Sequence, residues 1–344
     1  MKLFRLLLLV TAWLAAVLSA RAADSKPTPD FKEIYDLVRS YLPGMSEADL
    51  NRAAVEGLFT SLRGKVSLVG DDKSGDQSDV APVSKIAVLE NDVAYMRVER
   101  VDDGLPKSIR QSWKQMGSTN KLKGLALDLR FADGDDYAAA AAAADLFLTK
   151  ERKLLDWGGG TAKSKSKNDA IDLPVAVLVN RETVGAPEAL AAVLRETGTG
   201  LILGNTTAGA AMTSKEYPLK DGQRLRIATA AVKLGDGSEI STQGVKPDIE
   251  VAVSIPEERA YLEDAYAIVS PTGTIIATTS IEATNRLRRL RTSEADLVRS
   301  RREGLDLEEL ARNREPDKPL IRDPALARAV DVLKGLAVVR RSRS

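Results

Sequence analysis

The sequence predicts an α/β protein whose core is a largely parallel sheet, and three short runs carry this prediction. They are KGLALDLR at 123–130, PVAVLVN at 174–180 and GLILGN at 200–205, each almost continuously apolar. Strands of a parallel sheet have this pattern because both of their faces are covered. Helical patterns at 137–148 and 186–197 separate the runs. Alternating strands and helices indicate right-handed βαβ crossovers.

Residues 1–22, ahead of the core, are typical of a secretory signal peptide. Lys2 and Arg5 precede an apolar run at 6–18, and a small-x-small triplet ends at Ala22. The run is shorter than the roughly 17–25 residues that a membrane-spanning helix needs. We therefore expect cleavage after Ala22 and a secreted or periplasmic protein without a transmembrane anchor. An uncleaved anchor is the alternative.

Two amphipathic helices are expected in the segment 23–64. Apolar residues in FKEIYDLVRSYL at 31–42 share one helical face, and the second helix begins with the capping pattern SEAD at 46–49. Residues 65–84 include the polar stretch GDDKSGDQSD, which predicts a linker.

The core domain is expected at 85–254, followed by a C-terminal extension. KIAVLENDVAYMRV indicates two strands around an Asn-Asp turn, and Asp-Gly turns after residue 217 predict added β-hairpins. DWGGGTAKSKSK at 156–167 lacks the spacing of a phosphate-binding loop and is interpreted as an exposed loop. Residues 255–344 form an Arg-rich helical extension, whose charges predict a solvated face with a frayed end.

Composition excludes several kinds of chemistry. The chain has no histidine and no cysteine, so zinc sites of the Cys/His type, cysteine nucleophiles and Ser-His-Asp triads cannot be built. No metal or other cofactor is expected. Net charge is +1 over 344 residues, which does not indicate a nucleic-acid partner. The base of any covalent mechanism would have to be a lysine, a carboxylate or an amine.

Five motifs in order resemble the C-terminal processing, or tail-specific, serine peptidases. They are GLALDLR followed by Gly134, ADLFL, PVAVLVN followed by a small-residue turn and Glu188, GLILGNTTAG, and GVKPDIEV. The resemblance implies a crotonase-like α/β core. It also implies a nucleophilic serine in the turn before Glu188, and a general-base lysine after the glycine of the fourth motif.

At these positions the sequence departs from the family pattern. The serine position is Gly185, the lysine position is Ala210, and a glutamine common in the family corresponds to Ser214. Without a hydroxyl and a titratable base, no acyl-enzyme can form by the family's route. The resemblance therefore implies that no catalytic residue remains at these three positions.

The backbone is the part of the family site that the resemblance leaves in place. Matching positions for the two oxyanion-hole amides are Gly134 and Ala186. The loop FADGDD at 131–136 adds acidic residues, which we expect to disfavour a developing oxyanion. The linker at 65–84 replaces the PDZ module that many members carry, since a domain needs about 50 residues or more.

Together these features predict a non-catalytic pseudopeptidase that acts on extended peptides or an envelope protein by binding. The alternative is an active serine-type peptidase with relocated residues, for which Thr183 and Lys215 are the candidates. A crotonase-like enzyme that acts on a small acyl compound and a purely structural role are further alternatives. The sequence does not indicate the oligomeric state.

Overall fold

The computed structural model describes residues 29–62, 65–69, 81–118, 121–277 and 320–341. The predicted signal peptide lies outside these ranges. The chain divides into two compact units, Met1–Ser61 and Leu62–Ser344. Within the described ranges, no helix has both the length and the apolar character needed to cross a membrane.

The first unit contains the two expected helices, α2 (Phe31–Tyr41) and α3 (Glu47–Ser61). An ion pair of 3.1 Å between Arg39 and Glu47 joins the end of α2 to the start of α3. None of the residues of these helices is buried.

The second unit is built on a six-stranded sheet. Five neighbouring strands are parallel, and the sixth, β2, pairs antiparallel with β3. Glu90 and Asn91 form the β2–β3 turn with left-handed φ values of 47° and 72°. The predicted parallel sheet and Asn-Asp hairpin are thus confirmed. In spatial order the strands are β12 (Ile249–Glu250), β8 (Gly200–Gly204), β7 (Val175–Val179), β4 (Gly124–Asp128), β3 (Val93–Val98) and β2 (Val83–Leu89).

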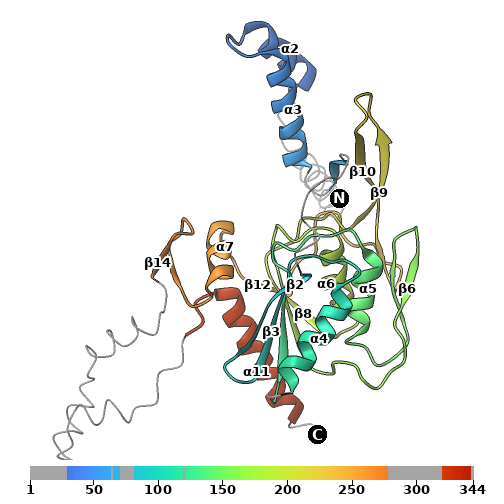
Figure 1. Ribbon diagram of the computed structural model, residues 1–344, viewed down its shortest axis with the longest axis vertical. Coiled ribbons are helices and arrows are strands. Elements are labelled where there is room, and N and C mark those ends of the chain that lie inside the picture. The colour runs from blue at the N-terminus through green and yellow to red at the C-terminus, as the bar shows by residue number, and fades with distance from the viewer. Residues whose placement is uncertain (1–28, 63–64, 70–80, 119–120, 278–319, 342–344) are drawn as a thin grey trace, which may run out of the picture. The chain divides into compact units, whose positions relative to one another are not determined.

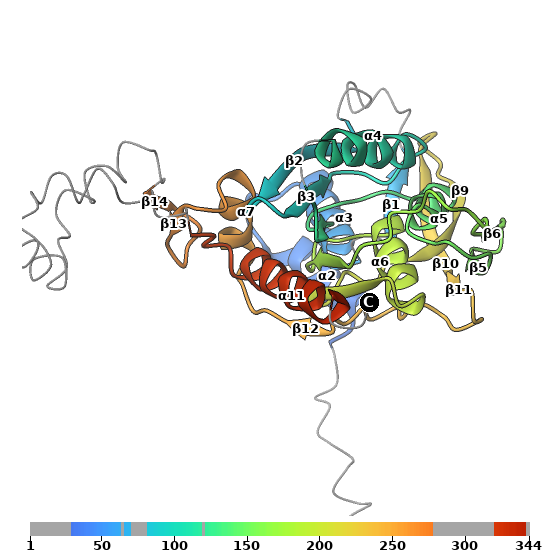
Figure 2. The ribbon, with the colours of Figure 1, turned by 90° about the horizontal axis from the view of Figure 1, so that it is seen from below.

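Helices cover both faces of this sheet (Figures 1 and 2). On one face lie α4 (Leu105–Gly117), α5 (Tyr137–Asp145) and α6 (Ala186–Glu196), and on the other lies α11 (Pro324–Arg341). The arrangement is a three-layered α/β fold, as the alternating pattern predicted.

Strand residues alternate between the two cores. In β4, Leu125 and Leu127 pack with α4, α5 and α6, whereas Ala126 packs with α11. Because successive side chains of a strand point to opposite faces, a strand covered on both sides needs apolar residues at every position. This explains why the three runs that predicted the sheet are continuously apolar.

Short antiparallel strands and a further helix complete the second unit. One three-stranded sheet has the order β1 (Val66–Val69), β10 (Arg224–Ala231), β9 (Met212–Pro218). The other has the order β11 (Lys233–Leu234), β5 (Lys153–Asp156), β6 (Thr161–Lys163). Helix α7 (Ile255–Glu263) precedes the pair β13 (Ile268–Val269) and β14 (Ile275–Ala277).

Three segments differ from the sequence-based expectation. Strand β1 lies inside the stretch expected to be a linker, and β6 lies inside the stretch interpreted as an exposed loop. The C-terminal segment is not merely a solvated extension, because α11 contributes Leu326, Val330 and Leu333 to the core. Its apolar face was obscured by the many charges around it. Most of the Arg-rich stretch, 278–319, lies outside the described residues.

Candidate functional site

The loops that follow β4, β7 and β8 meet at the carboxyl edge of the parallel sheet, where α/β proteins commonly bind ligands. In the loop after β7, Gly185 precedes the first residue of α6 and has φ 76° and ψ −119°. This left-handed φ favours glycine. A Cβ atom added to Gly185 would lie 2.3 Å from the carbonyl oxygen of Gly134. The turn therefore has neither a side chain nor space for one in this conformation.

The Gly134 carbonyl also accepts the hydrogen bond of the Ala186 amide. The Ala186 N–H donates to Gly134 O at 2.7 Å, and the neighbouring Val184 N–H donates to Ala132 O at 3.0 Å. An oxyanion hole needs N–H donors directed at the place where the negative oxygen develops. Here the Ala186 amide, one of the two predicted donors, points at the carbonyl of Gly134, whose own amide is the other predicted donor.

The carboxylate of Glu188 connects Gly185 and Ala210, the two residues that the motif alignment predicts at the serine and lysine positions. Its Oε1 accepts hydrogen bonds from the amides of Gly185 at 2.9 Å and Ala210 at 2.7 Å. Its Oε2 accepts from the Gly209 amide at 2.7 Å and from the Thr207 hydroxyl. Glu188 is fully buried, and carboxylates with several N–H donors form the stronger class of hydrogen bonds.

The structure thus brings Gly134, Gly185, Ala186 and Ala210 together. The sequence marked Glu188 only as part of a motif and missed its role as the acceptor that fixes both loops. A glutamate three residues after a helix cap is a known signal for hydrogen bonding back to the cap amide, and it could have indicated half of this arrangement.

Ser214 and the proposed substitutes Thr183 and Lys215 lie differently. Ser214 and Lys215 are exposed on β9, opposite Ala228 and Ile227 of β10. Thr183 is buried, and its hydroxyl donates to Leu129 O at 2.9 Å while accepting from the Asn180 amide at 3.0 Å. These hydrogen bonds, with a longer contact of 3.4 Å from the Thr183 hydroxyl to Asn180 Oδ1, hold the turn together.

Two acidic residues of the loop 131–136 form ion pairs with arginines. Asp135 forms an ion pair of 2.6 Å with Arg226, and Asp133 forms one of 3.5 Å with Arg100. Both carboxylates are mostly exposed. Water and the two arginines screen the charges of Asp133 and Asp135, which weakens the repulsion that these carboxylates would exert on an oxyanion.

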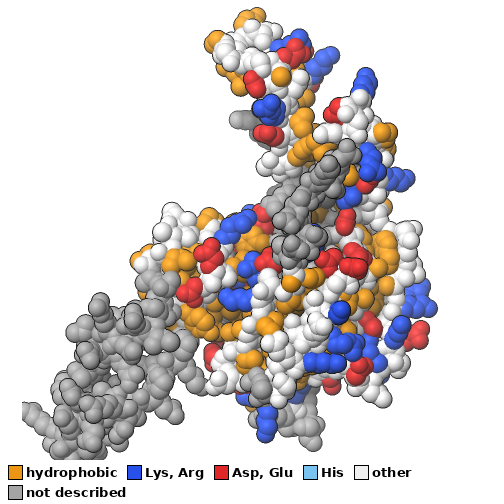
Figure 3. Space-filling view, viewed as in Figure 1, with side chains coloured by type: hydrophobic (Ala, Val, Ile, Leu, Met, Phe, Trp, Pro, Cys, Tyr) orange, Lys and Arg blue, Asp and Glu red, His pale blue; other side chains and the backbone are white. Residues whose placement is uncertain are grey.

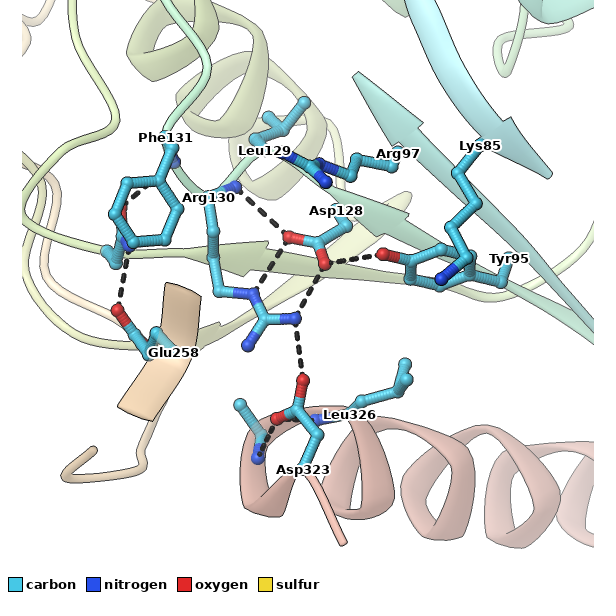
Figure 4. A network of polar contacts seen from close by, with 12 residues as sticks. Lys85, Tyr95, Arg97, Asp128, Leu129, Arg130, Phe131, Glu258, Asp323 and Leu326 are labelled. Atoms are coloured by element: carbon cyan, nitrogen blue, oxygen red, sulfur yellow. Dashed lines mark hydrogen bonds and ion pairs between the residues drawn. The ribbon is translucent and has the colours of Figure 1, made fainter. Parts of the chain in front are cut away.

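A second polar cluster lies on the α11 side of the same sheet edge (Figure 4). Arg130 is buried and donates to both oxygens of Asp128, at 2.9 and 2.7 Å, and to Asp323 at 2.8 Å. The Tyr95 hydroxyl donates to Asp128 at 2.9 Å. Burial, and then the Asp128 charge, raise the pKa of Tyr95, so that it stays protonated. The cluster joins β3, β4 and the start of α11, which indicates a structural role.

Glu258 of α7 lies at the border of this cluster. Its side chain is fully buried and accepts a hydrogen bond of 2.7 Å from the amide group of Asn180. Burial raises the pKa of Glu258 to about 7, although the Asn180 hydrogen bond and the Arg130 charge oppose this rise. Glu258 Oε1 and Arg130 Nη1 are both buried and have no hydrogen-bond partner among the described residues. Sequence reasoning did not find this residue, since a glutamate within the first turn of a helix is usually exposed.

No described group of three or more acidic residues is placed to hold a metal ion. The site therefore consists of backbone amides, one buried carboxylate and small side chains. The amides of Gly185, Ala186, Gly209 and Ala210 are already bonded within the chain, and at the predicted catalytic positions the set offers neither a nucleophile nor a base.

The fold and these loops define an α/β protein with a strand–turn–helix site at the carboxyl edge of its parallel sheet. Residues 92–251 match the model of peptidase family S41, so this part of the chain is similar to that family.

The chain is also similar to named relatives. It is 28% identical over 207 residues to the carboxy-terminal-processing protease of Bartonella bacilliformis, covering 56% of this chain and 47% of that protein. It is 24% identical over 239 residues to the carboxy-terminal processing protease CtpA of Bacillus subtilis, covering 67% of this chain and 48% of that protein. The chain thus spans about half the length of these relatives.

Two solved structures are similar to parts of the chain. For the photosystem II D1 C-terminal processing protease the TM-score is 0.41 at 24% identity, covering 49% of this chain and 48% of that one. For a lipoprotein from Streptococcus agalactiae the TM-score is 0.43 at 17% identity, covering 69% of this chain and 89% of that one.

Proposed function

We propose that this protein is a non-catalytic member of its peptidase family, which acts by binding an extended peptide or a protein segment. One observation carries the proposal. Glu188 accepts hydrogen bonds from the amides of Gly185 and Ala210, the two residues that the motif alignment matches to the family's serine and lysine. The loss of a nucleophile from a serine protease lowers kcat by about 10⁶-fold.

The closed backbone supports the same proposal. With the Ala186 amide bonded to the Gly134 carbonyl, a tetrahedral intermediate would lack one of its two predicted donors. Removing one such donor costs about 10²–10³ in kcat even when the nucleophile is present. The loops that hold the site remain well hydrogen-bonded, which favours retention of the scaffold for binding.

Two finer assignments belong to this proposal. We assign the core to the crotonase-like arrangement, because consecutive βαβ units build its sheet. We also place the mature protein outside the cytoplasm, in the periplasm or secreted, on the signal-peptide pattern at residues 1–22. N-terminal sequencing of the protein exported from its host tests the second assignment, since it should begin at Ala23.

The test of function separates binding from cleavage. Purified protein is incubated with fluorescently labelled casein, an unstructured polypeptide, and both the anisotropy and the fragment pattern are measured. We expect a saturable rise in anisotropy and no fragments. Absence of a saturable rise would refute the binding role.

The relocated-residue alternative has its own outcome in this experiment. Fragments that disappear in both the Thr183→Ala and the Lys215→Ala variants would establish an active peptidase and overturn the non-catalytic role. The engaged hydroxyl of Thr183 and the exposed position of Lys215 weigh against that result.

A further inference from the structure

The hairpin formed by β5 and β6 concentrates positive charge. Between Thr149 and Lys167 the chain has six basic residues and two acidic ones, whereas the whole chain has 50 basic and 49 acidic residues. This stretch contains the Gly- and Lys-rich motif that the proposed function does not use.

Four lysines of the hairpin are exposed and have no ion-pair partner among the described residues. Lys153 of β5 lies directly opposite Lys163 of β6, and like charges at opposite positions destabilise a strand pair. The other two are Lys150 and Lys165. Lys167 differs, because it pairs with Asp145.

Protection of a sheet edge explains only part of this pattern. Edge strands often carry lysine, which discourages pairing with another chain, and Lys163 lies on the edge strand β6. Lys153, however, lies on β5, the central strand of its sheet. Its charge opposite Lys163 requires another explanation, and an external anion would remove the repulsion.

Helix α4 extends the positive surface. Its sequence, LPKSIRQSWKQMG, has three basic residues and no acidic residue. Arg110 forms an ion pair of 2.8 Å with Asp169, which joins α4 to the segment after β6. Figure 3 shows Lys and Arg side chains, with Asp and Glu side chains among them, on the surface over α4 and the β5–β6 hairpin. We call the four hairpin lysines, together with Lys107 and Lys114 of α4, the basic face.

We propose that the basic face binds anionic lipid headgroups at a membrane surface. This inference goes beyond peptide binding at the family site. Lysine is a flexible, strongly hydrated point charge, which suits mobile headgroups rather than a fixed partner geometry. It is depleted in protein–protein interfaces. Trp157, at the hairpin tip, is only partly exposed and packs against the core, so the face lacks the open aromatic platform typical of single-stranded nucleic-acid sites.

The strength of the interaction follows from the number of charges. Each lysine near an anionic membrane surface strengthens binding by about fivefold, and four together by at least about 100-fold. Because exposed charges are screened over about 8 Å at physiological ionic strength, the binding should weaken steeply as salt is added.

The experiment measures co-sedimentation of the full-length protein with vesicles. One set of vesicles contains phosphatidylcholine with about 30% phosphatidylglycerol, which gives roughly the surface charge of an anionic leaflet. The other set contains phosphatidylcholine alone. The quantity compared is the ratio of the two partition coefficients, which cancels any purely apolar binding. In the test variant Lys150, Lys153, Lys163 and Lys165 become Gln. In the matched control the exposed Lys32, Lys215, Lys220 and Lys246 become Gln, with the same change in net charge.

We expect wild type to prefer the anionic vesicles and to lose that preference in about 0.5 M salt. In the test variant the ratio of the partition coefficients should fall by at least about 100-fold, and in the control variant by less than about threefold. A double Lys163→Gln/Lys165→Gln variant provides an intermediate loss of about 25-fold if the quadruple variant does not fold.

Three results would overturn the proposal. They are equal partitioning of wild type into both vesicle types, equal losses in the test and control variants, and preferential binding of the basic face to polyglutamate rather than to vesicles. The last result would assign the face to an acidic protein partner.

Discussion

At Gly185 the missing side chain and the backbone conformation form a single feature. The left-handed φ favours glycine, and the Gly134 carbonyl occupies the position that a Cβ atom would need. That carbonyl is also the acceptor for the Ala186 amide. A serine at residue 185 would therefore have to displace the loop after β4, and so more than one substitution separates this turn from an active one.

This contact makes Gly185→Ala more destabilising than its φ alone would imply. Gly158 is a matched control, because its φ is 73° and no atom lies within 4 Å of the Cβ position. We expect Gly158→Ala to cost about 1 kcal/mol of unfolding free energy from backbone strain. We expect Gly185→Ala to cost about 3 kcal/mol, since a steric contact is added.

Urea denaturation followed by circular dichroism measures both variants. Equal losses would show that the loop of Gly134 yields without cost. In that case the loop of Gly134 could move away from the turn and make room for a side chain at residue 185.

Helix α11 shows how an element of the C-terminal segment becomes part of the core. Of its buried residues, Ala325, Leu326, Ala329, Val330 and Leu333 recur at intervals of three and four, which is the period of one helical face. They cover the sheet face that carries Ala126, Ala176 and Leu178. Without α11 this face of the parallel sheet would be open to water, although parallel sheets are normally covered on both sides.

We expect Leu333→Ala to lower the unfolding free energy by about 3 kcal/mol, because Leu333 is fully buried and lies close to Gly124. Leu336→Ala on the same helix is the control. Leu336 is 40% exposed, and its truncation should cost less than about 1 kcal/mol. Thermal and urea unfolding check both values. Similar, small losses in the two variants would mean that α11 does not contribute to the cooperative core.

For the whole molecule, the sequence predicted local patterns better than long-range contacts. Continuous apolar runs identified β4, β7 and β8, since burial on both faces leaves a direct signature in each strand. The motif alignment also singled out Gly185 and Ala210, and the structure connects both of them to Glu188. These features are local, or are fixed by the topology of a parallel sheet.

The parts that could not be predicted depend on residues far apart in the chain. The ion pair between Arg130 and Asp323 joins positions separated by 193 residues, and neither residue has a local pattern that indicates burial. Strand β1 is stable through pairing with β10, so its four residues alone suggested a linker. The Gly134 carbonyl could not be anticipated either, because the direction of a peptide group is not encoded by glycine itself.

The whole molecule's stability should depend on pH through Glu258. The pKa of Glu258 is about 7 in the folded protein, raised by burial from its ordinary value of 4.5. Between these values the folded chain binds a proton that the unfolded chain releases, so stability falls as pH rises through this window and levels off above about pH 7. Arg130, Asp128 and Asp323 are the charged groups that act on Glu258.

We expect the ionisation of Glu258 to lower the free energy of unfolding by about 3 kcal/mol between pH 4.5 and pH 8. Glu258→Gln keeps an acceptor for Asn180 and cannot ionise, so its stability relative to wild type should grow over the same interval. Glu263→Gln changes an exposed acid of the same helix and should track wild type at every pH. Urea midpoints measured at half-unit steps between pH 4 and pH 8 give these differences. A constant offset between Glu258→Gln and wild type would show that folding does not shift the pKa of Glu258, which would contradict this prediction.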